Sequence, residues 1–343
     1  MKQVWIARGG GPEVLEVREA PTPEPAKGEI RVAVHAAGVN FADLMARMGT
    51  YPDGPPPPCV VGYEVSGVVE AVGEGVEDSW LGRWVIAATR FGGYSSHVVV
   101  SAALVAPLPE RLSFAQGAAL PVNGLTAWFI LEEQHRVRAG DRILVHSAAG
   151  GVGLMAGQLI RRRGATAVGT ASGSKHARLR ERGWTELVDY NVEDYEKVLA
   201  DGPPFDLVMD PLGGFHWGKG LRLLKSGGKV ACYGMSVGSS GTVASRLSTL
   251  GHILRIPFWA MSPPGLINAN LGVLGVNLGR MWDEAERMHA WLEALVGLVE
   301  AGELDLHVHA EVPFSRAAEA HQMIHDRKSF GKVVLVPDEV YAG

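Results

Sequence analysis

Residues 140–153, GDRILVHSAAGGVG, decide the fold that we expect for this chain. The apolar residues 143–145 predict a short buried strand, which a glycine-rich turn follows directly. An apolar helical pattern begins straight after this turn, at residues 154–160. Glycines let the backbone approach a pyrophosphate closely, and a helix N-terminus offers N–H groups to phosphates. We therefore expect a dinucleotide-binding unit rather than a purely structural turn, with these cofactor-binding residues: Ala149, Gly150, Gly151, Val152 and Gly153.

Composition narrows the class of protein. The chain has 343 residues, which suits two domains, and its formal net charge of -5 gives no sign of nucleic-acid binding. Cys59 and Cys232 match no metal-ligand spacing, so we expect free thiols in a reducing, cytoplasmic setting. Residues 1–15 contain no apolar signal-peptide core. The most hydrophobic tract, 251–279, is interrupted by arginine, proline and asparagine, so we predict no membrane span.

Two patterns divide the chain. Residues 1–122 hold short β-type runs separated by glycine and proline, whereas strands and helices alternate from residue 123. Such alternation predicts a parallel, doubly wound sheet with strands at 142–146, 166–170, 206–210, 229–234 and 271–276. Further helices are expected at 152–163, 174–182, 193–200, 215–224, 282–300 and 315–326. Because we expect the last strand, 333–336, to rejoin the first domain, we predict an α/β protein with domains 1–122 plus 281–343, and 123–280.

Several segments carry a resemblance to a known family. They are GVNFADLMARMGTY (38–51), VVGYEVSGVVEAVGEGV (60–76), LTAWFIL (125–131), LVHSAAGGVG (144–153), MDPLGG (209–214) and FGKVVLVP (330–337). Over nearly the whole chain the sequence resembles the zinc-independent quinone oxidoreductases of the medium-chain dehydrogenase/reductase superfamily. It is most similar to the branch named for the vesicle amine transport protein. The resemblance implies a GroES-like catalytic domain, a Rossmann dinucleotide-binding domain, a cleft between them and a homodimer.

The resemblance also bears on metal binding. Zinc-dependent relatives carry a cysteine where this chain has Asn40, a histidine where it has Tyr63, and a second cysteine near Asn123. Only Glu64 remains of the metal-binding residues, and one carboxylate cannot build a tetrahedral zinc site. The four-cysteine structural lobe is missing around residues 90–100 as well. We therefore expect no metal, and we interpret Glu64 as a buried, hydrogen-bonded structural carboxylate.

The residues after the second strand of the nucleotide-binding domain indicate which coenzyme is bound. An acidic residue there usually holds the ribose 2′-OH of NAD, but here the strand 166–170 runs into ASGSK without an acid. Ser172 lies in this loop, and Lys175 is placed for a 2′-phosphate. The resemblance adds Tyr190 and Arg327 as partners of that phosphate, although each of the three could be an ordinary surface residue. We expect NADPH (NADP+).

Candidate catalytic residues lie between Asn40 and Tyr51. Asn40 could donate an amide N–H to a substrate carbonyl as negative charge develops there. Tyr51 matches a proton-donating tyrosine of related enoyl-thioester reductases, and it is either this acid or a wall of the pocket. Asp43 and Arg47 have i, i+4 spacing and could pair on a helix. Met45 replaces a second tyrosine of many quinone oxidoreductases, which puts a two-tyrosine pocket in doubt.

Other positions follow from the family more loosely. We expect Asn123 and Thr126 to approach the nicotinamide, and His146 to be a strand histidine rather than a catalyst. The residues Gly234, Met235 and Ser236 end a strand at the edge of the sheet where ligands collect. The apolar tract 245–268 could roof a substrate pocket, or it could serve core or dimer packing.

Together these features predict an NADPH-dependent reductase of conjugated C=C bonds. The substrate would be a small α,β-unsaturated carbonyl compound, and the sequence does not separate a quinone, an enone and an enoyl thioester such as enoyl-CoA. The alternative is a non-catalytic NADPH-binding protein that acts through a protein or membrane partner. The presence of both Asn40 and Tyr51 favours the enzyme.

Overall fold

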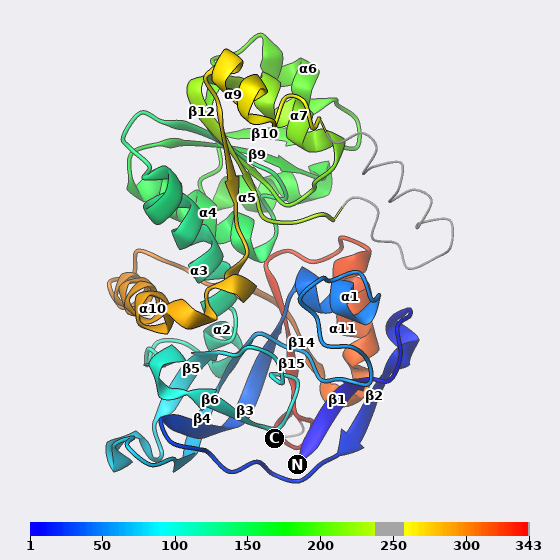
Figure 1. The fold of residues 1–343 in the computed structure, drawn as a ribbon, viewed down its shortest axis with the longest axis vertical. Helices are drawn as coiled ribbons and strands as arrows, with labels where there is room; N and C mark the ends of the chain where they lie inside the picture. The colour runs from blue at the N-terminus through cyan, green and yellow to red at the C-terminus, as the bar shows by residue number, and fades with distance from the viewer. Residues whose placement is uncertain (237–256, 342–343) are drawn as a thin grey trace. The chain divides into compact units, whose positions relative to one another are not determined.

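The structure is a computed structural model that describes residues 1–236 and 257–341. The chain divides into two compact units, the first made of Met1–Leu125 with Leu278–Gly343 and the second of Thr126–Asn277. Both units combine sheets with helices, so the fold class is the mixed α/β class predicted from the sequence (Figure 1).

A seven-stranded sheet forms the core of the first unit. Its strand order is β14-β15-β3-β4-β5-β7, and β6 pairs with β3. The bounds are β3 (Glu29–Val39), β4 (Glu64–Val72), β5 (Trp84–Ala88), β6 (His97–Ser101), β7 (Val105–Pro107), β14 (Val308–Pro313) and β15 (Lys332–Val336). The final strand therefore returns to the sheet of the N-terminal residues, where β15 pairs antiparallel with β3, as its apolar sequence predicted.

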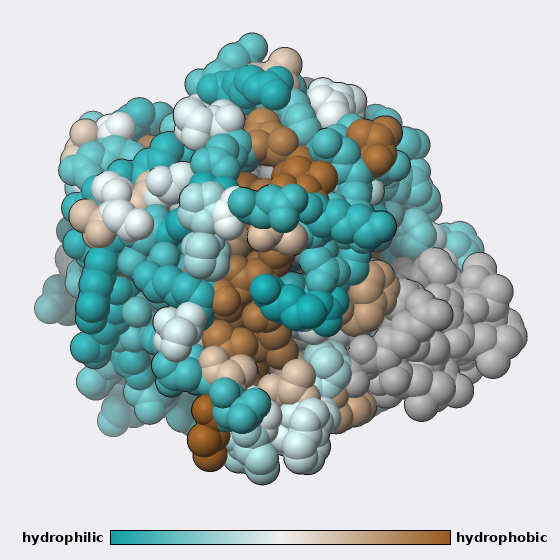
Figure 2. All heavy atoms as spheres, turned by 90° about the horizontal axis from the view of Figure 1, so that it is seen from above, coloured by the Kyte–Doolittle hydropathy of each residue, from teal (hydrophilic) through white to brown (hydrophobic). Residues whose placement is uncertain are grey.

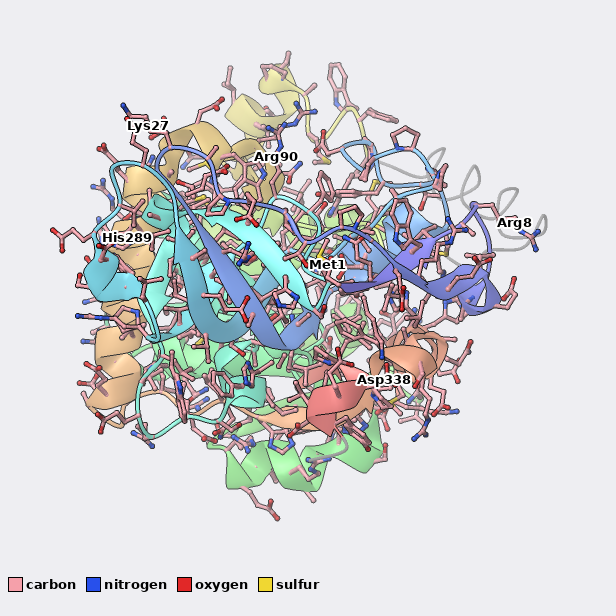
Figure 3. The ribbon with its side chains drawn as sticks, turned by 90° about the horizontal axis from the view of Figure 1, so that it is seen from below. Met1, Arg8, Lys27, Arg90, His289 and Asp338 are labelled. Atoms are coloured by element: carbon pink, nitrogen blue, oxygen red, sulfur yellow. The ribbon has the colours of Figure 1, made fainter. Side chains whose placement is uncertain are left out.

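Shorter elements surround this sheet. A separate antiparallel pair joins β1 (Lys2–Ile6) to β2 (Leu15–Glu19). The helices are α1 (Phe41–Arg47), α2 (Phe114–Gly117), α10 (Ala285–Glu300), α11 (Ala317–His325) and α12 (Asp338–Tyr341). Lys2 Nζ lies 3.4 Å from Glu339 Oε2, so β1 and α12 meet through this ion pair. Met1 and Asp338 are labelled beside these two elements in Figure 3.

The second unit is built on a parallel sheet of six strands in the order β10-β9-β8-β11-β12-β13. The strands are β8 (Arg142–Val145), β9 (Thr166–Ala171), β10 (Glu186–Asp189), β11 (Phe205–Asp210), β12 (Leu224–Cys232) and β13 (Gly272–Gly275). The helices of this unit are α4 (Gly151–Arg162), α5 (His176–Glu181), α6 (Tyr195–Ala200), α7 (Phe215–Arg222) and α9 (Pro263–Ala269). The sequence predicted all of these elements except β10 and α9. The direction of winding reverses between β8 and β11, the place where such sheets bind ligands.

The division between the units falls inside α3 (Pro121–Trp128), which continues as a π-helical segment, Phe129–His135. Within the described residues, the helical stretch Phe114–His135 is the one long and apolar enough to cross a membrane. Its most apolar window is 67% buried inside the protein, which is typical of a core helix.

Candidate functional site

Helix α1 is fixed in the first unit through a buried carboxylate. Asp43 is fully buried and accepts hydrogen bonds from Asn40 N (2.8 Å), Gly62 N (3.1 Å) and Tyr94 Oη (3.0 Å). Burial raises the pKa of Asp43 to about 7, although these hydrogen bonds favour the charged form. The carboxylate thus ties the start of α1, and with it Asn40, to the loop that carries Tyr63.

Arg47 lies at the other end of α1 and does not pair directly with Asp43. It donates instead to Gly10 O (3.1 Å) and to His321 Nδ1 (3.3 Å) on α11. Because Nδ1 accepts, His321 Nε2 carries the proton and donates to Tyr94 Oη at 3.2 Å. Burial, reinforced by Arg47, holds the pKa of His321 well below its ordinary value. A continuous buried chain of hydrogen bonds therefore joins both ends of the helix.

The side chain of Asn40 contacts an ion pair that the sequence did not reveal. Lys332 Nζ, at the start of β15, bonds to Glu64 Oε1 and lies 2.6 Å from Asn40 Oδ1. Asn40 Nδ2 donates to the same Glu64 oxygen at 2.9 Å, and Val122 N donates to the other oxygen at 2.7 Å. An ammonium can only donate, so the oxygen of the Asn40 amide must face Lys332. The interpretation of Glu64 as a buried, hydrogen-bonded carboxylate is confirmed by these contacts.

Sheet topology explains why these groups meet. Strand β3 lies between β15 and β4, and Val39 pairs with Val333 while Ala37 pairs with Val65. Lys332 and Glu64 begin the two flanking strands, so both lie at the end of β3 where Asn40 follows. Gly38 leaves the space that Glu64 occupies, because a Cβ there would lie 2.6 Å from Ala118 O and even closer to the Glu64 carboxylate.

Tyr51 follows α1 and is half-buried. Its ring meets that of Tyr63 edge-on, with centroids 6.2 Å apart, and Tyr63 in turn packs against Phe91 at 5.1 Å. Burial raises the pKa of Tyr51 above its ordinary value, so the phenol stays protonated throughout the neutral range. Tyr63 is 6% exposed, and burial together with the interaction between its hydroxyl and that of Tyr51 raises the pKa of Tyr63. The chain therefore does bring a second tyrosine to Tyr51, although from position 63 rather than 45.

The residues at the metal positions of zinc-dependent relatives do not suit a zinc ion. Asn40 and Glu64 bind each other and a lysine ammonium, Tyr63 is a phenol, and Asn123 Nδ2 donates to Ala119 O at 3.0 Å. Within residues 1–236 and 257–341, no three His, Cys, Asp or Glu side chains gather in a way that could hold a metal. Bringing a divalent cation to Glu64 would also place it beside Lys332, which carries like charge.

In the second unit, the glycine-rich turn joins β8 to α4. Gly150 N donates to Ser147 O at 2.8 Å, and Ala148 N donates to Thr170 O at 3.0 Å. A Cβ on Gly153 would lie 2.7 Å from Ala148 Cα, so only glycine allows this turn to close. Gly150 caps α4 without a side-chain hydrogen bond, which leaves the first N–H groups of a 12-residue helix available to phosphates.

His146 precedes this turn and is fully buried. Its Nδ1 lies 3.0 Å from Thr170 Oγ1, while Nε2 has no partner among the described residues. Burial lowers the pKa of His146 to about 3, so the ring is neutral, which agrees with a strand histidine. On the neighbouring strand, Asp210 Oδ1 accepts from Leu212 N and Gly213 N at 2.6 and 2.9 Å and shapes the loop that follows.

The residues expected at the 2′-position of the coenzyme belong to different units. Ser172, Lys175 and Tyr190 are half-buried in the second unit, whereas Arg327 is exposed in the first. The structure adds an acid that the sequence analysis overlooked, because Asp189 ends β10 and its carboxylate lies beside Gly173. Strand β10 pairs with β9, so the acid reaches this loop from the adjacent strand.

The remaining predicted residues lie on both units. Ser236 N donates to Pro211 O at 3.1 Å, so Gly234, Met235 and Ser236 contact the loop after β11 at the carboxyl edge of the sheet. Asn123 is buried in the first unit and Thr126 in the second. Of the apolar tract 245–268, residues 245–256 lie outside the described part of the chain. Phe258 and Trp259 are exposed, whereas Met261 packs against the core of the second unit.

Comparisons with known proteins define the class. The family model described as an alcohol dehydrogenase GroES-like domain matches residues 26–110, and the model described as a zinc-binding dehydrogenase matches residues 182–335. These are the two modules of the medium-chain dehydrogenase/reductase superfamily. The chain belongs to this superfamily, in the branch of VAT-1 homologues and quinone oxidoreductases.

Three relatives support this placement. The human synaptic vesicle membrane protein VAT-1 homolog is 39% identical over 94% of this chain and 82% of its own length. A quinone oxidoreductase of Pseudomonas aeruginosa is 34% identical over 98% of this chain and 99% of its own. The crystal structure of Escherichia coli quinone oxidoreductase complexed with NADPH has a TM-score of 0.84 and 30% identity, covering 98% of this chain and all of that one.

Proposed function

We propose that this protein is an NADPH-dependent, zinc-independent oxidoreductase that reduces the conjugated C=C bond of α,β-unsaturated carbonyl compounds. The observation that carries the proposal is the Asn40 amide, which Lys332 and Glu64 hold in one orientation where zinc-dependent relatives have a metal ligand. The quinone oxidoreductase relatives support the reaction class.

The coenzyme would be held in the second unit. Its pyrophosphate suits the turn Gly150–Gly153, with the neighbouring Ala149, at the start of α4. Lys175 would bind the 2′-phosphate, and Ser172 and Tyr190 directly follow the paired strands β9 and β10. The solved NADPH complex of the Escherichia coli relative supports this choice. Bound NADPH supplies a hydride to the β-carbon of the substrate.

Residues of the first unit would stabilise the negative charge on the substrate oxygen and supply the proton for the α-carbon. As negative charge develops on the substrate carbonyl oxygen, an N–H of Asn40 donates to it and stabilises the enolate. Tyr51, whose phenol is protonated at neutral pH, supplies the proton for the α-carbon, and the product has gained one hydride and one proton across the former double bond.

The proposal is tested by NADPH oxidation with a panel of quinones, enones and enoyl-CoA thioesters. At least one class should be reduced by metal-free protein, and elemental analysis should find no stoichiometric zinc. Activity that appears only after zinc is added would contradict the proposed chemistry.

A second function has support in the names of the VAT-1 relatives, which are described as synaptic vesicle membrane proteins. In that case the chain binds NADPH without reducing a substrate and acts through a protein or membrane partner. NADPH binding without oxidation on any carbonyl compound, together with retention on vesicles, would favour this alternative.

Two further proposals concern assembly and location. We propose a homodimer, because β13 is an edge strand of its sheet as far as the chain is described, and Phe258, Trp259 and Ile267 nearby in sequence are 65, 77 and 80% exposed. Figure 2 shows apolar side chains interrupting an otherwise hydrophilic surface.

A cytoplasmic location agrees with the free thiols of Cys59 and Cys232, and cell fractionation tests it.

A further inference from the structure

We propose that the Lys332 ammonium serves as the cation of the candidate substrate site and acts on the substrate through Asn40. Lys332 is thus a positioning residue, which orients and polarises the amide that receives the carbonyl oxygen. The inference rests on the proposed function, since it assigns a part in the same reaction.

Lys332 is buried at a strand position where the fold does not require a charged residue. Its side chain is 3% exposed, and Glu64 is fully buried. Every residue of β15 is buried, and the other four are Val or Leu, so an apolar residue would suit this position in the sheet. Removing a charged pair from water is costly, and apolar replacements of similar volume are often as stable. A buried lysine here therefore points to a role in the site.

The hydrogen bonds around Asn40 leave one donor for a ligand. Its oxygen accepts from Lys332 at 2.6 Å, and one N–H donates to Glu64 at 2.9 Å. The remaining N–H has only Gly38 O, at the limiting distance of 3.5 Å. Asn40 is half-buried, whereas Lys332 and Glu64 are buried, so Asn40 is the member of the triad that a carbonyl oxygen can approach.

The ammonium strengthens that donor. The ammonium that donates to the amide oxygen draws electron density away from the amide nitrogen, and hydrogen bonds in series reinforce one another in a buried setting. When hydride addition places negative charge on the substrate oxygen, Lys332 offsets the charge of Glu64, which accepts from the same amide nitrogen and would otherwise repel that oxygen. Lys332 keeps its protons throughout, so it changes the barrier and not the stoichiometry.

The test replaces both charges together, because removing one would leave the other buried and unpaired. The variant combines Lys332→Met with Glu64→Gln, and Lys332→Arg retains the charge. The matched control combines Arg142→Met with Glu186→Gln, which removes an ion pair of 2.6 Å in the second unit. For each variant we would measure kcat and KM on the best enone, the Kd for NADPH, and the NMR signals of the Asn40 side-chain amide, assigned by their loss in Asn40→Ala.

We expect the neutral pair to lower kcat about 10- to 100-fold with a smaller change in KM, while Lys332→Arg recovers part of the loss. Adding Asn40→Ala to the neutral pair should cost little more, because both changes act on one donor. The control should keep kcat and Kd. An unchanged kcat, fully additive losses or an unchanged Asn40 signal would overturn the inference. An inactive wild type with a shifted Asn40 signal would instead overturn the proposed function alone.

Discussion

Single substitutions distinguish the roles of Tyr51 and Tyr63, the two neighbouring tyrosines of the candidate site. Tyr51→Phe removes the proposed proton donor and should lower kcat about 100-fold, with the Kd for NADPH nearly unchanged. Tyr63→Phe tests the neighbouring phenol, whose ring packs edge-on against Tyr51 and whose hydroxyl interacts with the Tyr51 hydroxyl. Losing that hydroxyl should change the free energy of unfolding by less than about 1 kcal/mol. Steady-state kinetics and denaturant unfolding measure both effects, and an unchanged kcat in Tyr51→Phe where chemistry limits the rate would remove Tyr51 from the mechanism.

Substitutions of Lys175 and Asp189 should change the affinity for NADPH in opposite directions. Lys175→Ala should weaken NADPH binding by about 1.5–3 kcal/mol and barely affect NADH, because a charge-assisted hydrogen bond to the 2′-phosphate is lost. Asp189→Asn removes a negative charge beside Gly173 and should tighten NADPH binding by about 1 kcal/mol. Fluorescence titration with both coenzymes measures these shifts. Equal losses for NADPH and NADH in Lys175→Ala would show that this lysine does not contact the phosphate.

At the scale of elements, the turn between β8 and α4 depends on backbone space. Gly153→Ala places a methyl group 2.7 Å from Ala148 Cα, so the turn must open, and we expect NADPH affinity to fall at least about 10-fold. Gly297→Ala is the control, because a Cβ there meets nothing within 4 Å on α10. That change should stabilise the helix by about 0.5–1 kcal/mol and leave NADPH binding unaltered. Wild-type affinity in Gly153→Ala would contradict the assignment of this turn.

At the scale of the molecule, the proposed dimer can be broken on its surface. Trp259→Asp combined with Ile267→Asp introduces charge into two strongly exposed apolar positions. We expect this variant to elute as a monomer while the wild type elutes as a dimer, because a charged face cannot be buried between two copies. Light scattering coupled to size exclusion measures the mass. A monomeric wild type would contradict the proposal directly.

The whole fold also shows what local sequence can and cannot reveal. The other strands of the second unit were predictable because each contains a short apolar run, whereas β10, ELVD, is short and half charged and was missed. The candidate site depends on contacts across the chain. Lys332 meets Glu64 over a separation of 268 residues, and no local pattern marks that pair. Asp189 and Tyr63 were likewise visible as residues but not as neighbours of Gly173 and Tyr51.

The position of β15 has a consequence for how the protein is made. This strand lies between β14 and β3 inside the first sheet, yet a ribosome synthesises it after the whole second unit. The whole second unit emerges before it, and domains commonly fold as units during synthesis. Until Lys332 arrives, Glu64 has no counter-charge and the first sheet has a gap beside β3. A nascent chain, or one cut before β15, therefore presents an open strand edge to chaperones and proteases until β15 pairs with β3.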